Sequence, residues 1–159
     1  MNCQWSVVSG QLHVVPERHS VEKINTKGTM KSAFENLRVY QLSEKLADEI
    51  WELVIGWNNF ARDTVGRQLV RAADSIGANI AEGTGRGTYQ DNRRFVRTAR
   101  GSLRETQHFL RRAFRRELIG QTQVKTIKPL IDELAPRLNA YLKSIGTAKK
   151  EGEPDTPDE

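Results

Sequence analysis

The chain has 159 residues, of which 28% are charged and 37% hydrophobic, and its net charge is +5 at pH 7, so it can form one soluble domain with a buried core. It has no run of 18 apolar residues and no signal peptide, so no membrane span is predicted and the expected location is cytoplasmic. Cys3 is the only cysteine, which excludes an intrachain disulfide, and no cluster of ligand-type side chains predicts a metal site.

The two ends of the chain differ from its middle. Residues 1–30 show no sustained helical period and are expected to be a disordered or mis-annotated extension, with either Met1 or Met30 as the true start. The last 14 residues hold two lysines and five acids, so residues 147–159 are expected to form a disordered acidic tail. Residues 31–145 hold 20 basic against 13 acidic side chains, an excess of 7 that suggests an anionic partner, with simple solubility as the alternative.

The first predicted helix covers about residues 36–57. Ser32 and Glu35 have the spacing of a capping box, with Asn36 as a rival cap. Apolar side chains at spacings of three and four predict its inward face: Val39, Leu42, Leu46, Ile50, Leu53 and Trp57. A second apolar set lies about a quarter turn away: Tyr40, Ala47, Trp51 and Val54. This set either widens the core face or forms a subunit interface, and the sequence favours neither.

The second predicted helix covers about residues 62–82 and is typical of the buried centre of a bundle. Its apolar stripe consists of Val65, Leu69, Ala72, Ile76 and Ile80. A polar stripe beside it is predicted to form a hydrogen-bonded seam between helices: Gln68, Arg71, Ser75, Asn79 and Glu82. We expect Arg71 to pair with Glu105 and Glu82 to pair with arginines of the next helix. Gly83 should end the helix, and the glycine-rich loop after it predicts a turn, because a phosphate-binding loop needs a preceding strand and a Gly-Lys-Ser/Thr ending.

The third predicted helix covers about residues 88–116, with Thr88 as its cap and Asp91 as a favourable charge in its first turn. Its predicted inward face consists of Phe95, Val96, Ala99, Leu103, Thr106, Leu110, Ala113 and Phe114. Nine arginines lie in this helix, and six of them fall within about 60° of one another on a helical wheel. These six are called the arginine ridge: Arg93, Arg97, Arg100, Arg104, Arg111 and Arg115.

The arginine ridge is the main candidate for a binding site. Like charges one turn apart destabilise a helix by a few tenths of a kcal/mol per pair, so the ridge favours a compensating partner. Guanidinium groups pair with phosphates, which predicts nucleic-acid binding that depends on salt and little on base sequence. No aromatic residue interleaves with the ridge, so no base specificity is predicted. Alternatively, acids such as Asp48, Glu49 and Glu52 of the same or another subunit neutralise the ridge.

The fourth predicted helix covers about residues 122–145, after a closing turn at residues 118–120. Its apolar stripe consists of Val124, Ile127, Ile131, Leu134, Leu138, Leu142 and Ile145. Pro129 and Pro136 lie inside it and project away from the stripe, which predicts a bent or interrupted helix. The four helices together predict an all-α fold, an up-down-up-down antiparallel four-helix bundle within residues 31–146, with flexible N- and C-terminal tails.

The segment QLVRAADSIGANIAEG at residues 68–83 is the most specific motif of the chain. Other residues that belong to the same pattern are Phe34, Leu37, Val39, Tyr40, Gln41, Gly85, Arg86, Phe95, Ala99, Gly101, Ser102 and Glu105. Over about residues 34–145 the chain resembles the bacterial four-helix-bundle family of 23S rRNA intervening-sequence proteins. A similar bundle is the accessory protein of diversity-generating retroelements, which partners a reverse transcriptase and binds nucleic acid. The resemblance implies a homopentamer around a central pore, although the N-terminal extension, the helix prolines and the acidic tail depart from the family.

Three classes of function remain. The leading hypothesis is a non-catalytic, oligomeric protein that binds RNA or DNA through the arginine ridge and is associated with an rRNA intervening sequence or a ribonucleoprotein. The second is a protein-interaction scaffold or adaptor that docks an acidic or polymerase-type partner. An enzyme is the least favoured, because Ser75 has no neighbouring histidine and Glu82 has no paired carboxylate. We expect no cofactor, no small-molecule substrate and no membrane partner.

Overall fold

The computed structural model describes residues 5–8, 11–14 and 33–147. The chain divides into two compact units, Met1–Met30 and Lys31–Glu159, and each is described by itself. In the first unit, β1 (Trp5–Val8) and β2 (Gln11–Val14) form an antiparallel hairpin, a feature that a search for helical periodicity does not detect. The other expectations for residues 1–30, and those for the tail after Thr147, lie outside the described residues.

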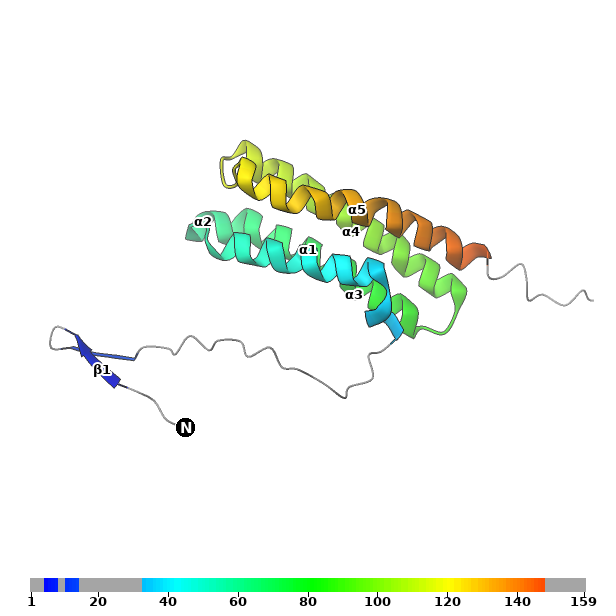
Figure 1. Cartoon of the computed structure of the whole chain (residues 1–159), viewed down its shortest axis with the longest axis horizontal. Coiled ribbons are helices and arrows are strands. Elements are labelled where there is room, and N and C mark those ends of the chain that lie inside the picture. The colour runs from blue at the N-terminus through cyan, green and yellow to red at the C-terminus, as the bar shows by residue number, and fades with distance from the viewer. Residues whose placement is uncertain (1–4, 9–10, 15–32, 148–159) are drawn as a thin grey trace, which may run out of the picture. The chain divides into compact units, whose positions relative to one another are not determined.

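The second unit is an all-helical bundle with four long helices, as predicted (Figure 1). The 3-10 turn η1 (Ala33–Asn36) precedes the first of them. The long helices are α1 (Arg38–Ile55), α3 (Arg67–Gly85), α4 (Tyr89–Arg115) and α5 (Gln121–Thr147). Between α1 and α3, the short helix α2 (Asn59–Ala61) and the π-helical turn η2 (Arg62–Gly66) continue directly into α3. Among the described helices, none combines the length and the apolar composition needed to span a bilayer.

The long helices pack side by side, and the chain reverses direction between one and the next (Figure 1). The contacts show that α3 and α4 are antiparallel: Ser75 lies against Ser102, and the later residue Gly83 lies against the earlier residue Asn92. Within the described helices, α1 packs against α3 and α5, and α4 packs against the same two helices. The backbones of α1 and α4 do not approach each other closely along the described helices, so the two helices occupy diagonally opposite corners of the bundle. Their outward faces therefore point to opposite sides.

The core is built mainly from the predicted apolar stripes. All five stripe positions of the second predicted helix are at most 6% exposed. On α1, Leu53 of the predicted inward face is only half-buried, whereas Val54, which was left open between core and interface, is buried in the core. The reason lies on the neighbouring helix, because Gly66 has no side chain and leaves room for Val54. A Cβ atom at Gly66 would lie 2.7 Å from Val54 Cγ1.

Two helices begin differently from the prediction. Leu37 precedes α1 and makes no side-chain capping bond, so Asn36 is not the cap, while Ser32 lies outside the described residues. The second helical segment starts at Asn59 instead of about residue 62. Asn58 caps it, because its Oδ1 accepts a hydrogen bond from the backbone N–H of Ala61 at 2.9 Å.

The ends of α3 and α4 also differ from the prediction. Gly83 does not end α3, which continues to Gly85, and Gly87 makes the turn with a φ of 72°. At the end of α4, Glu117 adopts a φ of 57°, and the backbone N–H of Leu118 donates to the carbonyl of Ala113 at 3.0 Å. This is the bonding of a Schellman motif, in which glycine usually occupies the left-handed position.

The prolines do not interrupt α5, so the predicted interruption is wrong. Pro129 and Pro136 lie inside one continuous helix and are both exposed. The two carbonyls that lose an N–H partner can therefore be hydrated, which makes the missing bonds less costly than in a core. The inward positions Ile127, Leu134 and Leu138 stay buried at 4% exposure or less.

Candidate nucleic-acid interface

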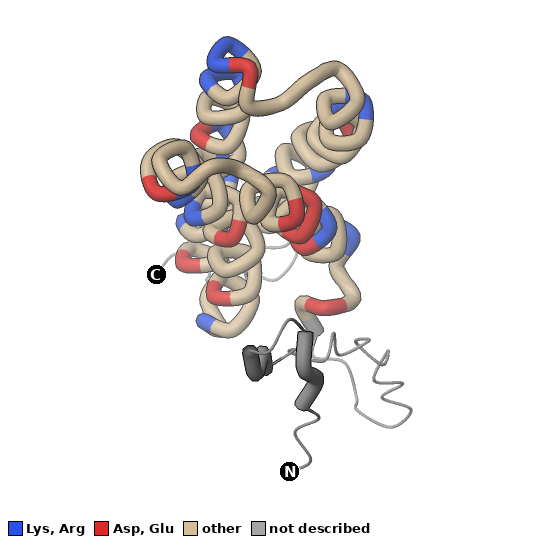
Figure 2. The backbone as a smooth tube through the Cα atoms, turned by 90° about the vertical axis from the view of Figure 1, so that its left-hand side faces the viewer, with Lys and Arg blue, Asp and Glu red and all other residues tan. Residues whose placement is uncertain are grey.

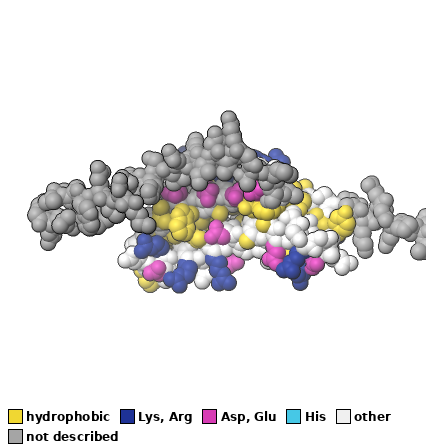
Figure 3. Space-filling model, turned by 90° about the horizontal axis from the view of Figure 1, so that it is seen from below, with side chains coloured by type: hydrophobic (Ala, Val, Ile, Leu, Met, Phe, Trp, Pro, Cys, Tyr) yellow, Lys and Arg dark blue, Asp and Glu magenta, His cyan; other side chains and the backbone are white. Residues whose placement is uncertain are grey.

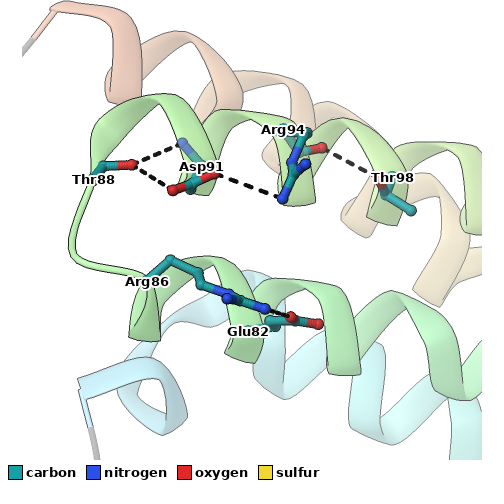
Figure 4. A network of polar contacts seen from close by, with 6 residues as sticks. All are labelled: Glu82, Arg86, Thr88, Asp91, Arg94 and Thr98. Atoms are coloured by element: carbon teal, nitrogen blue, oxygen red, sulfur yellow. Dashed lines mark hydrogen bonds and ion pairs between the residues drawn. The ribbon is translucent and has the colours of Figure 1, made fainter.

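A capped turn sets the start of α4. Thr88 Oγ1 accepts a hydrogen bond from the backbone N–H of Asp91 at 3.1 Å and donates to Asp91 Oδ2 at 2.9 Å (Figure 4). The predicted cap is confirmed. The carboxylate of Asp91 also lies in the first turn, where the helix dipole favours negative charge.

Two arginines close to this turn, Arg86 and Arg94, have partners within the chain. Arg86 pairs with Glu82, and Arg94 Nη2 lies 3.6 Å from Asp91 Oδ1 (Figure 4). The hydrogen bond that Arg86 donates to the carboxylate of Glu82 is the main reason that the pKa of Arg86 is raised. Both guanidinium groups also lie over the ring of Phe95, at 5.4 Å and 5.0 Å from its centroid. Arg86 therefore links the end of α3 to α4, whereas the contacts of Arg94 lie within α4.

The arginine ridge, by contrast, has no acidic partner in the part of the chain that the structure describes. Five of its six side chains are exposed, and Arg100 is half-buried. No carboxylate among the described residues forms an ion pair with any of the six. Their one hydrogen bond there runs from Arg100 Nη1 to Asn139 Oδ1 at 3.4 Å. At 1.5 Å per residue, the ridge extends about 33 Å from Arg93 to Arg115.

The acids of α1 cannot neutralise the ridge within one chain. Eight arginines lie on α4, whereas four acidic residues lie on α1 at the opposite corner: Glu44, Asp48, Glu49 and Glu52. Figure 2 looks along the bundle and shows the basic and acidic positions on its helices. Asp48, Glu49 and Glu52 are among these α1 acids, and none of them forms an ion pair with α4. Neutralisation by acids of another subunit stays a prediction.

A groove between α4 and α5 adjoins the carboxyl-terminal end of the ridge. Its volume is about 730 Å³, and Arg111 and Arg115 belong both to the ridge and to the groove wall. Its apolar lining comes from both helices and from the turn between them: Leu110, Phe114, Ile119, Val124, Ile127 and Ile131. Phe114 was predicted to face the core, but it is 40% exposed. The helical wheel misplaces it because Phe114 lies at the margin of the buried face, where the position of α5 decides its exposure.

The polar stripe of α3 forms a seam only in its middle. Asn79 Nδ2 donates to Ser75 O at 2.7 Å and to Ser75 Oγ at 3.0 Å. The hydroxyls of Ser75 and Ser102 lie 3.0 Å apart across the α3–α4 interface. Ser102 Oγ gives its hydrogen to the carbonyl of Thr98 at 3.2 Å, so Ser75 is the donor between the two serines. Ser102 is a buried member of the seam that the sequence pattern does not reveal.

The remaining members of the polar stripe do not bridge the helices. Gln68, Arg71 and Glu82 are exposed. Glu82 pairs with Arg86, and no described carboxylate pairs with Arg71, so both predicted interhelical pairs are wrong. The stripe is wider than the contact with α4: among its described members, Ser75 hydrogen-bonds across that contact, and Asn79 supports Ser75 from the same helix.

The side of the bundle formed by α1 and α3 carries apolar, acidic and basic side chains (Figure 3). Its exposed large apolar residues include Trp51 at 55%, Ile55 at 47% and Phe60 at 81%. Burial and, secondarily, the charge of Asp48 raise the pKa of Asp74 on α3. Within the described residues, no three His, Cys, Asp or Glu side chains come together as a potential metal site.

Comparison with known proteins supports the resemblance. The family model described as 23S rRNA-intervening sequence protein matches residues 35–140, a range that includes the whole arginine ridge. The bundle is also similar to the crystal structure of a protein of unknown function from the S23 ribosomal protein family of Bacteroides thetaiotaomicron. That similarity has a TM-score of 0.59 and 25% sequence identity, and it covers 66% of this chain and 98% of that one. No curated protein matches the chain.

Proposed function

The chain belongs to the 23S rRNA-intervening sequence protein family, and we propose that it binds RNA or DNA. We propose further that it is a non-catalytic, cytoplasmic protein associated with an rRNA intervening sequence or a ribonucleoprotein. The arginine ridge is the proposed contact surface for phosphate groups. One observation carries this proposal: six arginines along about 33 Å of helix have no carboxylate partner in the described chain, whereas Arg86 and Arg94 close by do.

The physics of the ridge favours phosphate as the partner. Repulsion between arginines one turn apart works mildly against folding, and phosphate groups relieve it by pairing with the guanidinium forks. Six such contacts would release condensed counterions from the nucleic acid. The logarithm of affinity should then fall against the logarithm of salt concentration with a slope of about −4 for a single strand and about −5 for a duplex.

Paired charge-neutralising variants test the ridge. Arg97→Gln/Arg104→Gln removes two ridge charges, and Arg67→Gln/Arg71→Gln removes two exposed charges from α3 as the matched control. We expect the ridge variant to bind nucleic acid about tenfold or more weakly and to make the salt slope shallower by about 2, because each phosphate contact contributes about one unit. The control should keep the wild-type slope. Fluorescence anisotropy over a salt series measures both quantities, and equal losses in the two variants would refute a localised site.

We also propose that the protein is a homopentamer, which is what the family resemblance implies. The uncovered apolar side chains of α1 and α2 support self-association, since exposed patches that contain several large hydrophobics commonly mark interfaces. Mass photometry of the full chain tests the stoichiometry, and a monomer over the accessible concentration range would remove the proposal.

A protein-interaction scaffold is the second candidate function. The observation in its favour is the exposure of Trp51, Ile55 and Phe60, which leaves large apolar side chains without a partner in the described chain. Affinity capture with and without nuclease treatment separates the two candidates. A protein partner retained after nuclease supports the scaffold, whereas loss of every partner supports nucleic-acid binding.

A further inference from the structure

We infer that the groove between α4 and α5 binds an unpaired nucleobase of the nucleic acid whose phosphates lie along the arginine ridge. The inference rests on the proposed function and specifies its ligand as a single-stranded or bulged segment, in which bases are free to leave the stack. It also changes the expectation drawn from the sequence, which found no aromatic residue among the ridge arginines.

The size and lining of the groove suit a flat, largely apolar group. Its volume of about 730 Å³ lies within the range of about 300–1,000 Å³ that is usual for small-ligand pockets. Phe114, which is 40% exposed, lines this groove together with the aliphatic side chains of Val124 and Ile131. Aromatic side chains beside a cationic track are the usual stacking platforms for bases of single strands.

The charge of the groove specifies an anionic ligand. Arg111, Arg112 and Arg115 line it, and none of them has an ion-pair partner within the described residues. The one carboxylate in the lining, Asp132, already pairs with Lys128. A ligand that fills the groove therefore brings negative charge together with an apolar surface, and a nucleotide has both.

Because the groove adjoins the arginine ridge, a bound nucleotide can place its phosphate at the ridge and its base in the groove. Arg111 and Arg115 lie one helical turn apart, about 6 Å along the axis, and both contribute to the groove wall. A phosphate bound at either arginine would leave its base next to Phe114. The side-chain amides of Gln107 and Gln121 also line the groove and have no hydrogen-bond partner among the described residues, so they are available to the edge of a base.

An acidic amphipathic peptide would share the charge and the apolar part of this ligand, but it fits the ridge poorly. A docked amphipathic helix needs apolar anchors at nearly every turn. Between Tyr89 at the start of α4 and Phe114 near its end, the described surface of α4 has no exposed large hydrophobic residue. The ridge therefore suits a chain that is anionic along its length and apolar only in its bases.

The experiment compares a labelled oligouridine with an RNA duplex of the same length, both titrated with the full chain by fluorescence anisotropy. Phe114→Ala empties the platform, Val124→Trp fills the groove, and Tyr89→Ala removes an exposed aromatic ring outside the groove as the control. We expect the two groove variants to bind oligouridine about 5- to 100-fold more weakly and the duplex as the wild type does. The control should match the wild type on both ligands. Circular dichroism verifies that each variant is folded.

The outcomes separate this inference from the proposed function. If both groove variants bind oligouridine like the wild type while Arg97→Gln/Arg104→Gln loses affinity, the groove inference is overturned and the ridge proposal stands. If the wild type binds neither ligand, both fail together. If an acidic amphipathic peptide binds the wild type and requires Phe114, while oligouridine does not, the groove is a protein-docking site and the inference is overturned.

A base analogue provides a direct signature. Oligonucleotides that carry 2-aminopurine lose fluorescence when the base stacks on an aromatic ring. We expect binding to the wild type to quench this emission and binding to Phe114→Ala to leave it higher at saturation. Equal emission in the two saturated complexes would contradict stacking on Phe114.

Discussion

Replacement of Gly83 by alanine should weaken the packing of α3 against α4. Gly83 is buried, and a Cβ atom there would lie 2.8 Å from Asn92 Oδ1, 3.0 Å from Phe95 Cβ and 3.3 Å from Asn92 Cα. The last two atoms belong to or adjoin the backbone of α4, so a rotamer change cannot remove the clash. The helix itself has to move away, and the carbonyl oxygen of the Asn92 side chain, which is buried without a hydrogen-bond partner in the described structure, has to move with it.

Two opposing effects set the magnitude. Alanine is favoured over glycine inside a helix by about 0.8–1 kcal/mol, whereas overpacking a tight contact costs about 1–3 kcal/mol. Gly85 in the same helix is the matched control, because a Cβ atom there would meet nothing within 4 Å. We therefore expect Gly85→Ala to be as stable as the wild type or up to about 1 kcal/mol more stable. Gly83→Ala should be less stable than Gly85→Ala by about 1–3 kcal/mol, the steric cost alone.

Urea unfolding followed by circular dichroism measures the difference. All variants are compared at one protein concentration, since association would make stability depend on concentration. In thermal unfolding, the two alanine variants should differ by about 3–6 °C for each kcal/mol in a domain of this size. In the double variant with Asn92→Ala, the loss should be smaller than the sum of the single losses, because one clashing atom is gone. Equal midpoints for Gly83→Ala and Gly85→Ala would refute the close approach of the two helices.

Two further predictions concern single positions outside the ridge. Glu117→Gly should stabilise the protein by about 1 kcal/mol, because it relieves the left-handed conformation at a φ of 57°, whereas Glu117→Ala removes the same charge without relieving it and serves as the control in urea unfolding. Asp74→Asn should increase the free energy of unfolding at pH 7 by the small amount usual for surface sites, about 0.5 kcal/mol or less, which a raised melting temperature would show. The pKa of Asp74 is raised in the folded state, so the folded state binds more protons than the unfolded state. The ionised carboxylate therefore destabilises the protein fully above the folded pKa and not at all well below 3.8. The stability gain of Asp74→Asn should vanish at pH 3, and a gain that persists there would contradict the ionised carboxylate as its cause.

Much of the bundle can be predicted from local patterns. Spacings of three and four located the helices because each of them buries one face, and the cap at Thr88 was predictable because it depends only on the next three residues. Helix ends were less predictable. Gly83 has the composition of a terminator, yet its missing side chain serves the approach of Asn92 and Phe95, which follow it in sequence but lie on another helix.

The candidate site also has one part that the sequence predicts and one part that only the tertiary structure reveals. The ridge is visible on a helical wheel, since only the geometry of one helix is involved. Its lack of acidic partners could not be known before α1 and α4 were placed at opposite corners of the bundle. The groove was missed because Phe114 belongs to the margin of the buried face, and its exposure depends on where α5 and the preceding turn lie.

By itself, the sequence determined four amphipathic helices, their main core stripes, a capped start of α4 and a row of six arginines. These features follow from the spacing of residues within one helix, and the chain carries that spacing wherever its neighbours lie. Only the tertiary structure decided which arginines are paired, that Val54 rather than Leu53 enters the core, and that Phe114 lines a groove beside the ridge. Each of these features depends on contacts between helices. The distance between two helices is set by the side chains of both, so the sequence of one helix alone cannot determine it.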